Sequence, residues 1–527
     1  METAREYPGP LPPGHPVRQK IKDGLVALSL ANLFFISAWY PLLYGGDSGY
    51  FKKPVTLPAL LAMAANLLWF ASLSWLVIRA WRRSDTRWLR LAGDCLLLLL
   101  LLVPLDFCRR QVFHILLYQV VAFLKSPAVL LSAALVWSLV LWQHRRAARL
   151  AAIAVGVFSP LAVFTLIRIA LLSLGLSHPA QSATEPSLPS PGPVSPGRPR
   201  VLWIIFDETD QRLAFEERPA GLRMPEFDRL RSQSLYATNA YPPGDSTLFS
   251  MPGLISGQGV AAVSVKSESD LAVTLADNGN VTPWSQLPSV FADARELGVN
   301  TALVGWYHPY RRVLFRGLNY CSWHPYPGWF PAQAPTFGAA MLSQIGCLAS
   351  DLQHERLYAN ACRQMMTESL SLATNTTYGL LLLHLPPPHR PGIYLPDKDQ
   401  FSLLSQPAVP GYFNNLVLAD RWLGKLRRAL EDSGLWSQTW LLLSADHSWR
   451  ASSLYDHRRD LRVPFLLKTG GEPASMTYSS RFNTVLTRDL ILAILRGQVG
   501  SRQDISAWLD AHRSEHMPVI SGPSTAD

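Results

Sequence analysis

The stretch VLWIIFDETD (201–210) opens the part of the chain with ordinary globular composition, and it predicts the fold class. Its first six residues are strand-forming and apolar without interruption, and Asp207 and Glu208 follow directly. A strand that is apolar on both faces is typical of a parallel sheet covered by helices. The stretch therefore predicts an α/β domain whose first strand carries two carboxylates to the carboxyl edge of the sheet.

The rest of this region repeats the pattern. Further strand-like runs occur at 301–305, 379–385, 439–444 and 463–468. Amphipathic stretches at 287–297, 355–372 and 412–431 lie between them. The alternation predicts a three-layer α/β sandwich, in which a mostly parallel sheet has helices on both faces.

Residues 1–176 have a different composition, dominated by Leu, Ala, Val, Trp and Phe. Five apolar segments approach or exceed the length of about 20 residues that a bilayer requires. They cover 24–44, 57–78, 89–105, 127–143 and 150–176. A shorter mixed segment, 111–124, is typical of an interfacial or re-entrant helix. We therefore expect an α-helical membrane domain of five spans.

The net charge of +10 lies in the loops of this apolar half. Basic residues are dense in the N-terminal tail, in the 79–90 loop and in the 145–149 loop, and sparse in the alternate loops. Under the positive-inside rule this places the N-terminus in the cytoplasm, and five spans then send the rest of the chain outside. We therefore expect a multi-pass membrane protein whose chain after residue 176 lies outside the cytoplasm, with no nucleic-acid partner.

These features divide the chain into four parts: a transmembrane domain (1–176), a Pro/Ser-rich linker (177–200), a globular domain (201–512) and a tail (513–527). Cys321, Cys347 and Cys362 fall in the exported part, where one disulfide and three buried thiols are equally compatible with the pattern.

A second polar group follows a strand at Asp446 and His447, as Asp207 and Glu208 follow the first. Both groups are expected at the same sheet edge. Carboxylates with an imidazole and no thiolate suit a divalent cation, with zinc as the first choice and manganese as the alternative. An Asp-Glu pair alone is more often a helix cap or a solvated turn, so the combination carries the prediction.

The stretch YPPGDSTLFSMPGLISG (241–257) places Ser246 and Thr247 at a loop-to-helix transition. A helix N-terminus presents free N–H groups that favour a phosphate or sulfate. A hydroxyl there, in contact with a cation, becomes a nucleophile at neutral pH. The alternative is an ordinary Ser-Thr helix cap.

Taken in order, IIFDET, DSTLFSMPGLISG, HLPPPH and SADHS, followed by RVPFLL, resemble the alkaline phosphatase/sulfatase superfamily. Within it the chain is most similar to membrane-anchored phosphoethanolamine and phosphoglycerol transferases, including lipoteichoic acid synthases. The resemblance implies roles for eleven positions. These are Thr247 as nucleophile and metal ligand; Glu208, Asp207, Asp446 and His447 as metal ligands; His389 as a catalytic or phosphate-binding histidine; and His308, Arg311 (or its neighbour Arg312), His384, His457 and Ser246 at the substrate.

Two departures argue against a sulfatase of the formylglycine type. Thr247 cannot be converted to formylglycine, and in SMPGL, which begins at Ser250, Leu254 stands where that chemistry requires an arginine. The resemblance thus implies metal-dependent transfer of a phospholipid head group, phosphoethanolamine or phosphoglycerol, to an envelope glycan or lipid through a phosphothreonine. It also implies a bacterial inner (cytoplasmic) membrane, with residues 201–512 as an extracytoplasmic, sulfatase-like catalytic domain. The alternatives are a membrane-tethered phosphodiesterase or sulfatase-like hydrolase, and a non-catalytic binding domain.

Overall fold

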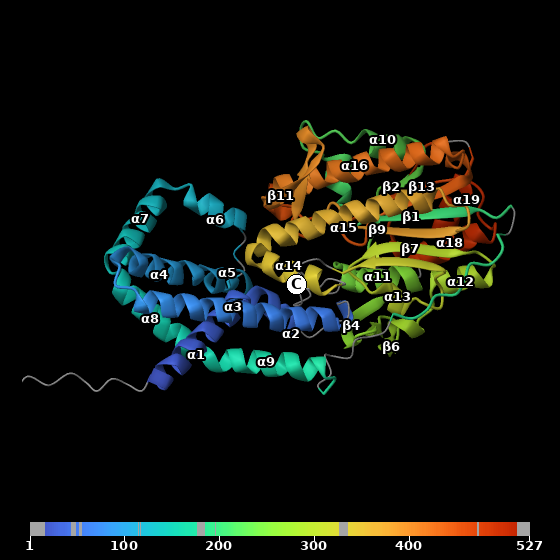
Figure 1. Ribbon diagram of the computed structural model, residues 1–527. Helices are drawn as coiled ribbons and strands as arrows, with labels where there is room; N and C mark the ends of the chain where they lie inside the picture. The colour runs from blue at the N-terminus through green and yellow to red at the C-terminus, as the bar shows by residue number, and fades with distance from the viewer. Residues whose placement is uncertain are drawn as a thin grey trace, which may run out of the picture. The chain divides into compact units, whose positions relative to one another are not determined.

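The computed structural model describes residues 16–43, 49–51, 55–113, 115, 117–176, 185–194, 197–325, 336–471 and 474–513. The chain forms two compact units, both built from discontinuous segments. The first contains Met1–Gly45, Val55–Pro179 and Phe330–Ser350, and the second contains Gly46–Pro54, Ala180–Trp329 and Asp351–Asp527 (Figure 1). Residues 514–527 of the expected tail and 177–184 of the expected linker lie outside the described residues.

The first unit is helical. Its helices are α1 (Pro16–Phe34), α2 (Ile36–Leu43), α3 (Leu57–Arg83), α4 (Arg87–Leu100), α5 (Leu102–Gln111), α6 (Leu117–Leu124), α7 (Pro127–Trp142), α8 (His144–Val157), α9 (Ser159–Ser173) and α14 (Phe337–Gly346). The apolar helices indicate a membrane-anchored protein.

The number of spans differs from the expected five. Among the described residues, α3 and the continuous stretch Arg87–Gln111 are long and apolar enough to cross a membrane. The pairs α1–α2 and α7–α8 are bent by 73° and 89°, so the structure supports two to four spans. The segment 150–176 is not one helix, because α8 ends at Val157 and α9 begins at Ser159 with Pro160, which has no N–H, in its first turn.

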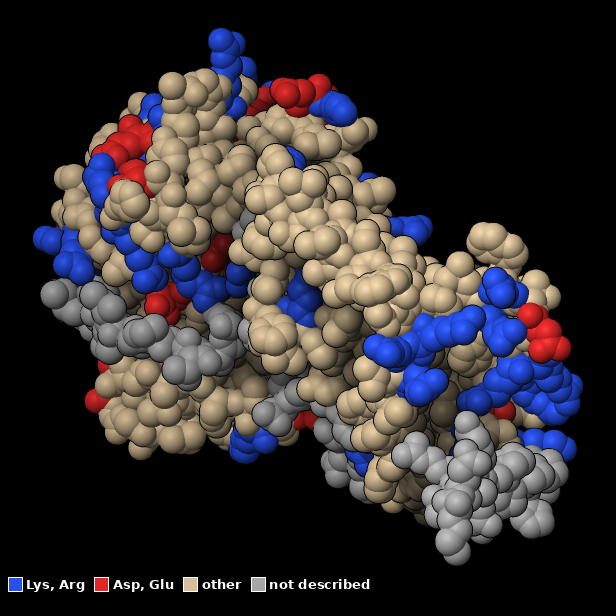
Figure 2. Space-filling model, turned by 90° about the vertical axis from the view of Figure 1, so that its left-hand side faces the viewer, with Lys and Arg blue, Asp and Glu red and all other residues tan. Residues whose placement is uncertain are grey.

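The basic loops lie together at one end of the first unit. Arg82 Nε lies 3.0 Å from Asp23 Oδ1, which joins the end of α3 to the start of α1. His144 Nδ1 lies 2.5 Å from Asp94 Oδ2, which joins α8 to α4. The exposed arginines of these loops are Arg82, Arg83, Arg87, Arg90, Arg145, Arg146 and Arg149. Figure 2 shows Lys and Arg side chains gathered on one part of the face it presents.

Helix α14 comes from the second half of the chain but belongs to the first unit. Its Gln344 accepts a hydrogen bond of 2.9 Å from Asn66 Nδ2 and donates one of 2.8 Å to the carbonyl oxygen of Ala59. Both side chains are buried. Because buried amides require partners, this pairing fixes α14 to α3.

The second unit contains an eight-stranded sheet in the order β14-β2-β13-β12-β1-β9-β7-β8. The strands are β1 (Arg200–Phe206), β2 (Leu235–Ala237), β7 (Thr301–Trp306), β8 (Tyr320–His324), β9 (Leu380–Leu385), β12 (Thr439–Ser444), β13 (Phe465–Lys468) and β14 (Met476–Tyr478). Only β13 pairs antiparallel with its neighbours, β12 and β2. The sheet is therefore mixed, with most pairs parallel.

Two hydrophobic cores cover the two faces of this sheet. Along β1, residues 201, 203 and 205 point into one core and residues 202, 204 and 206 into the other. The first core is covered by α11 (Thr247–Ser256), α12 (Val290–Glu296), α18 (Thr487–Leu495) and α19 (Arg502–His512). The second is covered by α10 (Pro225–Ser232), α15 (Ser350–Ala373) and α16 (Ala408–Asp432). The three-layer α/β arrangement is confirmed.

Smaller elements surround the main sheet. They are the antiparallel sheet β4 (Val260–Ser267), β5 (Asp270–Leu275) and β6 (Val281–Pro283), the hairpin β10 (Gly392–Leu395) and β11 (Gln400–Gln406), the pair β3 (Ala240–Tyr241) and β15 (Phe482–Asn483), and the short helices α13 (Tyr310–Val313) and α17 (Ser453–Asp456). All five cysteines are free.

Hairpin strand β10 packs on α16 through two glycines whose backbones touch. A Cβ atom on Gly392 would lie 2.3 Å from the Cα of Gly411. We therefore expect Gly392→Ala to force the strand and helix apart and to destabilise the protein by about 1–3 kcal/mol. Thermal unfolding of the purified protein measures this.

Gly338→Ala is the matched control for that variant. Gly338 lies in α14 with nothing within 4 Å of its added methyl group, so alanine there should leave the melting temperature unchanged or raise it. Equal melting temperatures for Gly392→Ala and the wild type would contradict the close approach of β10 and α16.

Candidate active site

Three adjacent strands end at the same place. Strands β9 and β12 flank β1 in parallel, and Ile205 of β1 pairs with His384 on one side and with Ser444 on the other. Asp207 lies two residues beyond Ile205, and Asp446 lies two residues beyond Ser444. The sheet topology therefore brings the side chains of Asp207, His384 and Asp446 together at the carboxyl edge of the sheet.

These three side chains form a buried group with the geometry of a metal site. One ligand atom from each lies within 4.8 Å of the others. Asp207 Oδ1, Asp446 Oδ2 and His384 Nε2 are buried and have no hydrogen-bond partner in the protein. Buried carboxylates without a compensating charge are strongly unfavourable. A divalent cation at this point would satisfy all three atoms, so the residues fit one.

Thr247 and His447 lie beside this group. Thr247 Oγ1 lies 3.3 Å from Asp207 Oδ2 and 3.4 Å from His447 Nε2. His447 Nε2 is in turn 3.5 Å from Asp446 Oδ2 and 3.6 Å from Asp207 Oδ1. All of these side chains are buried. The structure thus brings the predicted nucleophile into contact with predicted metal ligands.

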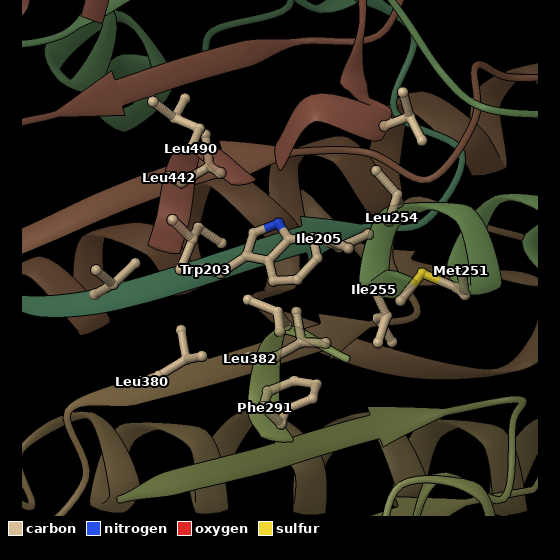
Figure 3. Close-up of a cluster of buried hydrophobic side chains, with 14 of the residues drawn as sticks. Trp203, Ile205, Met251, Leu254, Ile255, Phe291, Leu380, Leu382, Leu442 and Leu490 are labelled. Carbon is tan, nitrogen blue, oxygen red and sulfur yellow. The ribbon is translucent and has the colours of Figure 1, made fainter. Parts of the chain in front are cut away.

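Apolar packing holds Thr247 in this position. It is the first residue of α11, whose Met251, Leu254 and Ile255 lie against Trp203 and Ile205 of β1 (Figure 3). The loop before the helix is closed by Ser250, whose Oγ donates to the carbonyl oxygen of Gly244 at 2.9 Å. Because α11 is pressed onto β1, its first turn is fixed near the end of that strand.

The imidazoles of the site are oriented through their second nitrogen atoms. Tyr310 Oη lies 2.7 Å from His384 Nδ1, and the carbonyl oxygen of Ser448 lies 2.9 Å from His447 Nδ1. Both leave Nε2 directed at the carboxylates. This is the arrangement that metal-binding histidines commonly have, because the outer hydrogen bond fixes the tautomer and the ring angle.

Electrostatics in the group favour the charged forms of its members. Burial raises the pKa of Asp446, but the charges of His447 and His384 lower it by a larger amount. The pKa of Asp446 is therefore below its usual value. Burial lowers the pKa of His447, but Asp446, Asp207 and Glu208 outweigh burial and raise it. The site therefore concentrates negative charge that a cation or a protonated imidazole balances.

Glu208 points elsewhere. Its backbone has a φ of 64°, in the left-handed region, and its carboxylate pairs with Arg450 Nε at 3.3 Å. Burial raises the pKa of Glu208, but the charges of His389, His447 and Arg450 lower it below its usual value. The structure places this predicted ligand at the rim of the group, beside an arginine that sequence reasoning did not single out.

His389 is nearly buried in the loop after β9, where its Nδ1 lies 2.6 Å from the carbonyl oxygen of Arg390. Asn415 of α16 supports that loop by donating to the carbonyl oxygens of His389 and Pro391. The charge of His389 lowers the pKa of Glu208, so the loop that carries His389 lies near Glu208.

The remaining predicted substrate residues lie in several environments. His308 is fully buried, and both ring nitrogens contact protein atoms. Arg311 donates to the carbonyl oxygen of Pro186, and Arg312 pairs with Glu185. The Ser246 hydroxyl is buried without a hydrogen-bond partner next to Thr247. His457 is exposed at the end of α17, and among the described residues no contact joins its ring to the metal group.

The family is shown by comparison of the sequence with models of known families. The sulfatase family model matches residues 199–495, and the chain therefore belongs to the sulfatase family. This confirms the family resemblance read from the motifs. No curated protein matches the chain.

The solved structures to which the chain is similar have low sequence identity to it. A sulfatase from Pseudoalteromonas sp. is 15% identical over 56% of this chain and 68% of that one, with a TM-score of 0.39. The phosphonate monoester hydrolase of Agrobacterium radiobacter is 12% identical over 57% of this chain and 74% of that one, with a TM-score of 0.39. The lipoteichoic acid synthase LtaP from Listeria monocytogenes is 13% identical over 56% of this chain and 72% of that one, with a TM-score of 0.36.

Family membership implies an enzyme, and enzymes of this family use divalent metals. Among the described residues, the buried group of Asp207, His384 and Asp446 suits such an ion. The sequence analysis placed His384 at the substrate and not among the candidate metal ligands, because its position in this group depends on β9 lying next to β1.

We expect purified protein to retain about one divalent ion per chain, and Asp446→Asn to lose it, because the variant removes one of two buried carboxylate ligands. Elemental analysis by mass spectrometry measures the ion. Asp420→Asn is the control, since Asp420 is also buried but accepts hydrogen bonds from the N–H groups of Glu226 and Phe227. Retention of the ion by Asp446→Asn, or its equal loss in the control, would contradict the site.

Proposed function

We propose that this protein transfers the phosphorylated head group of a membrane phospholipid to a hydroxyl group of an envelope glycan or lipid. The transfer passes through a covalent phosphothreonine at Thr247. The observation that carries the proposal is the position of the Thr247 hydroxyl. It lies at the start of α11, in contact with Asp207 and His447, beside a buried group that fits a divalent metal.

In the first step, Thr247 Oγ1 attacks the phosphorus atom of the head group. A P–O bond forms to threonine, the P–O bond to diacylglycerol breaks, and diacylglycerol leaves with a proton. The atoms nearest to the threonine proton are Asp207 Oδ2 and His447 Nε2. A bound divalent ion, zinc in the first instance, would lower the pKa of the hydroxyl and neutralise charge on the phosphoryl oxygens.

In the second step, an acceptor hydroxyl attacks the same phosphorus atom, and the P–O bond to Thr247 Oγ1 breaks. His389 is proposed to take the proton of the acceptor, and Thr247 Oγ1 regains one proton as it leaves, so that the hydroxyl is restored. Because α11 begins at Thr247, the positive end of its helix dipole would favour negative charge on a phosphoryl group attached there. Arg450 and Glu208 line the same rim, so they would meet the part of the substrate that is not transferred.

The apolar helices favour a lipid donor. A catalytic unit carried by membrane-anchoring helices reaches phospholipid head groups without extracting acyl chains into water, whereas a soluble substrate needs no such anchor. Thr247 stands where formylglycine chemistry needs an oxidisable cysteine or serine. This substitution favours a mechanism in which the threonine hydroxyl itself is phosphorylated and then passes the group on.

Incubation with phospholipids tests the intermediate. Protein incubated with phosphatidylethanolamine or phosphatidylglycerol should carry the corresponding head-group mass on the Thr247 peptide, and Thr247→Ala should remove the adduct and reduce turnover by roughly 10³-fold or more. Mass spectrometry of the peptide and release of labelled diacylglycerol are the measurements.

Thr477→Ala is the matched control, because Thr477 is an exposed threonine on β14. Thr247→Ser should retain the adduct, because it keeps the hydroxyl. Absence of any adduct in metal-loaded wild-type protein would contradict the proposal. Head group released into water, without transfer to a glycan or lipid, would show a phosphodiesterase instead.

We further propose that the protein is a multi-pass component of a bacterial inner membrane with the second unit outside the cytoplasm. In a variant whose native cysteines are replaced by alanine, Gln503→Cys should react with a membrane-impermeant maleimide in intact spheroplasts. Asp85→Cys, in the basic loop before α4, should react only after permeabilisation. Labelling of Asp85→Cys in intact spheroplasts would contradict this orientation.

A further inference from the structure

The short helix Gly49–Phe51 lies between α2 and α3 in the chain but belongs to the second unit. Tyr50 is fully buried and Phe51 is 7% exposed. Both are members of the hydrophobic core that also contains Trp203, Met251 and Ile255. A connection between two apolar helices therefore contributes side chains to the core beneath α11.

The Tyr50 side chain reaches the nucleophile through one histidine. Tyr50 Oη lies 3.1 Å from His308 Nδ1, and His308 Nε2 lies 3.1 Å from the backbone carbonyl oxygen of Thr247. These contacts form a continuous chain from the phenol, through the imidazole, to the backbone of the residue that carries the reactive hydroxyl.

The chemistry of these atoms fixes the direction of both hydrogen bonds. In a neutral imidazole a single ring nitrogen carries a hydrogen. The carbonyl oxygen of Thr247 can only accept, so Nε2 carries that hydrogen and donates it. Nδ1 is then an acceptor, and the hydroxyl of Tyr50 is its donor.

The surroundings hold the tyrosine in place. Arg312 Nη1 donates to the carbonyl oxygen of Tyr50 at 3.3 Å, and its Nε pairs with Glu185 at 3.2 Å. The ring of Phe51 packs edge-on against Tyr307 at 4.9 Å, and Trp284 packs edge-on against His308 at the same distance. Arginine and aromatic contacts therefore fix both the backbone and the ring that meet His308.

We propose that Tyr50 is a positioning residue of the catalytic centre: it fixes the tautomer and orientation of His308, which in turn holds the first turn of α11 so that the Thr247 hydroxyl faces the metal group. The short helix Gly49–Phe51 is therefore a structural part of the active site. The consequence for turnover rests on the proposed role of Thr247, whereas the seating of Tyr50 against His308 does not.

The test is Tyr50→Phe in the full-length, zinc-loaded protein, with bis(4-nitrophenyl) phosphate as the probe. Phenylalanine keeps the ring but removes the donor to His308 Nδ1. We expect kcat to fall about 10-fold or more, which corresponds to the loss of one buried hydrogen bond, while KM and the zinc content stay unchanged. Tyr478→Phe is the control, since Tyr478 is a buried tyrosine whose hydroxyl donates to Asp510. It should keep the wild-type kcat.

A double-mutant cycle separates positioning from a merely structural role. In a His308→Asn background, Tyr50→Phe should change kcat by less than about twofold, because the path to Thr247 is already broken. A wild-type kcat for Tyr50→Phe, or an equal loss of kcat in both backgrounds, would overturn the proposal.

Failure of the proposed function gives a different result. If the wild type neither turns over the probe nor forms an adduct at Thr247, the proposed transferase and hydrolase functions are wrong. The contact between Tyr50 and His308 is then tested by the melting temperatures of the wild type, the two single variants and the double variant. Non-additive shifts for Tyr50→Phe and His308→Asn then support the contact, and additive shifts overturn it.

Discussion

The structure depends on one electrostatic constraint, the burial of two carboxylates at the end of a parallel sheet. Asp207 and Asp446 are fully buried, and each has an oxygen atom without a hydrogen-bond partner. His384 Nε2 also makes no hydrogen bond and lies 3.7 Å from Asp207 Oδ2. Such a group is strongly unfavourable unless a positive charge joins it. Three adjacent strands converge to create this arrangement, so the sheet order and the proposed chemistry have the same origin.

The nucleophile is placed by hydrophobic packing rather than by polar contacts of its own. Helix α11 is fixed by Met251, Leu254 and Ile255 against β1, and the Thr247 hydroxyl then lies within 3.4 Å of both Asp207 and His447. The backbone of Thr247 is held independently through His308 and Tyr50. The proposed catalysis requires a preorganised hydroxyl, and both sets of contacts restrain Thr247.

Much of the fold could be predicted from local pattern, because each central strand is a short apolar run with a clear end. The positions of Asp207, Thr247, Asp446 and His447 followed from those ends and from the helix start. Which strands lie next to each other in the sheet does not follow from local pattern. The position of His384 beside Asp207 and Asp446 could therefore not be predicted. The direction of Glu208 depends on its left-handed backbone, which no pattern indicates. The burial of Tyr50 and the return of α14 to the helical unit arise from tertiary packing alone.

The central claim is that Asp207, His384 and Asp446 hold a catalytic ion beside Thr247. Anomalous X-ray diffraction from crystals of the purified protein, recorded on both sides of the zinc absorption edge, tests this most directly. A single strong peak about 2.0–2.2 Å from the oxygen and nitrogen atoms of these side chains is the expected result. A site without any metal peak in active protein, or a metal bound elsewhere with Thr247 remote from it, would contradict the account.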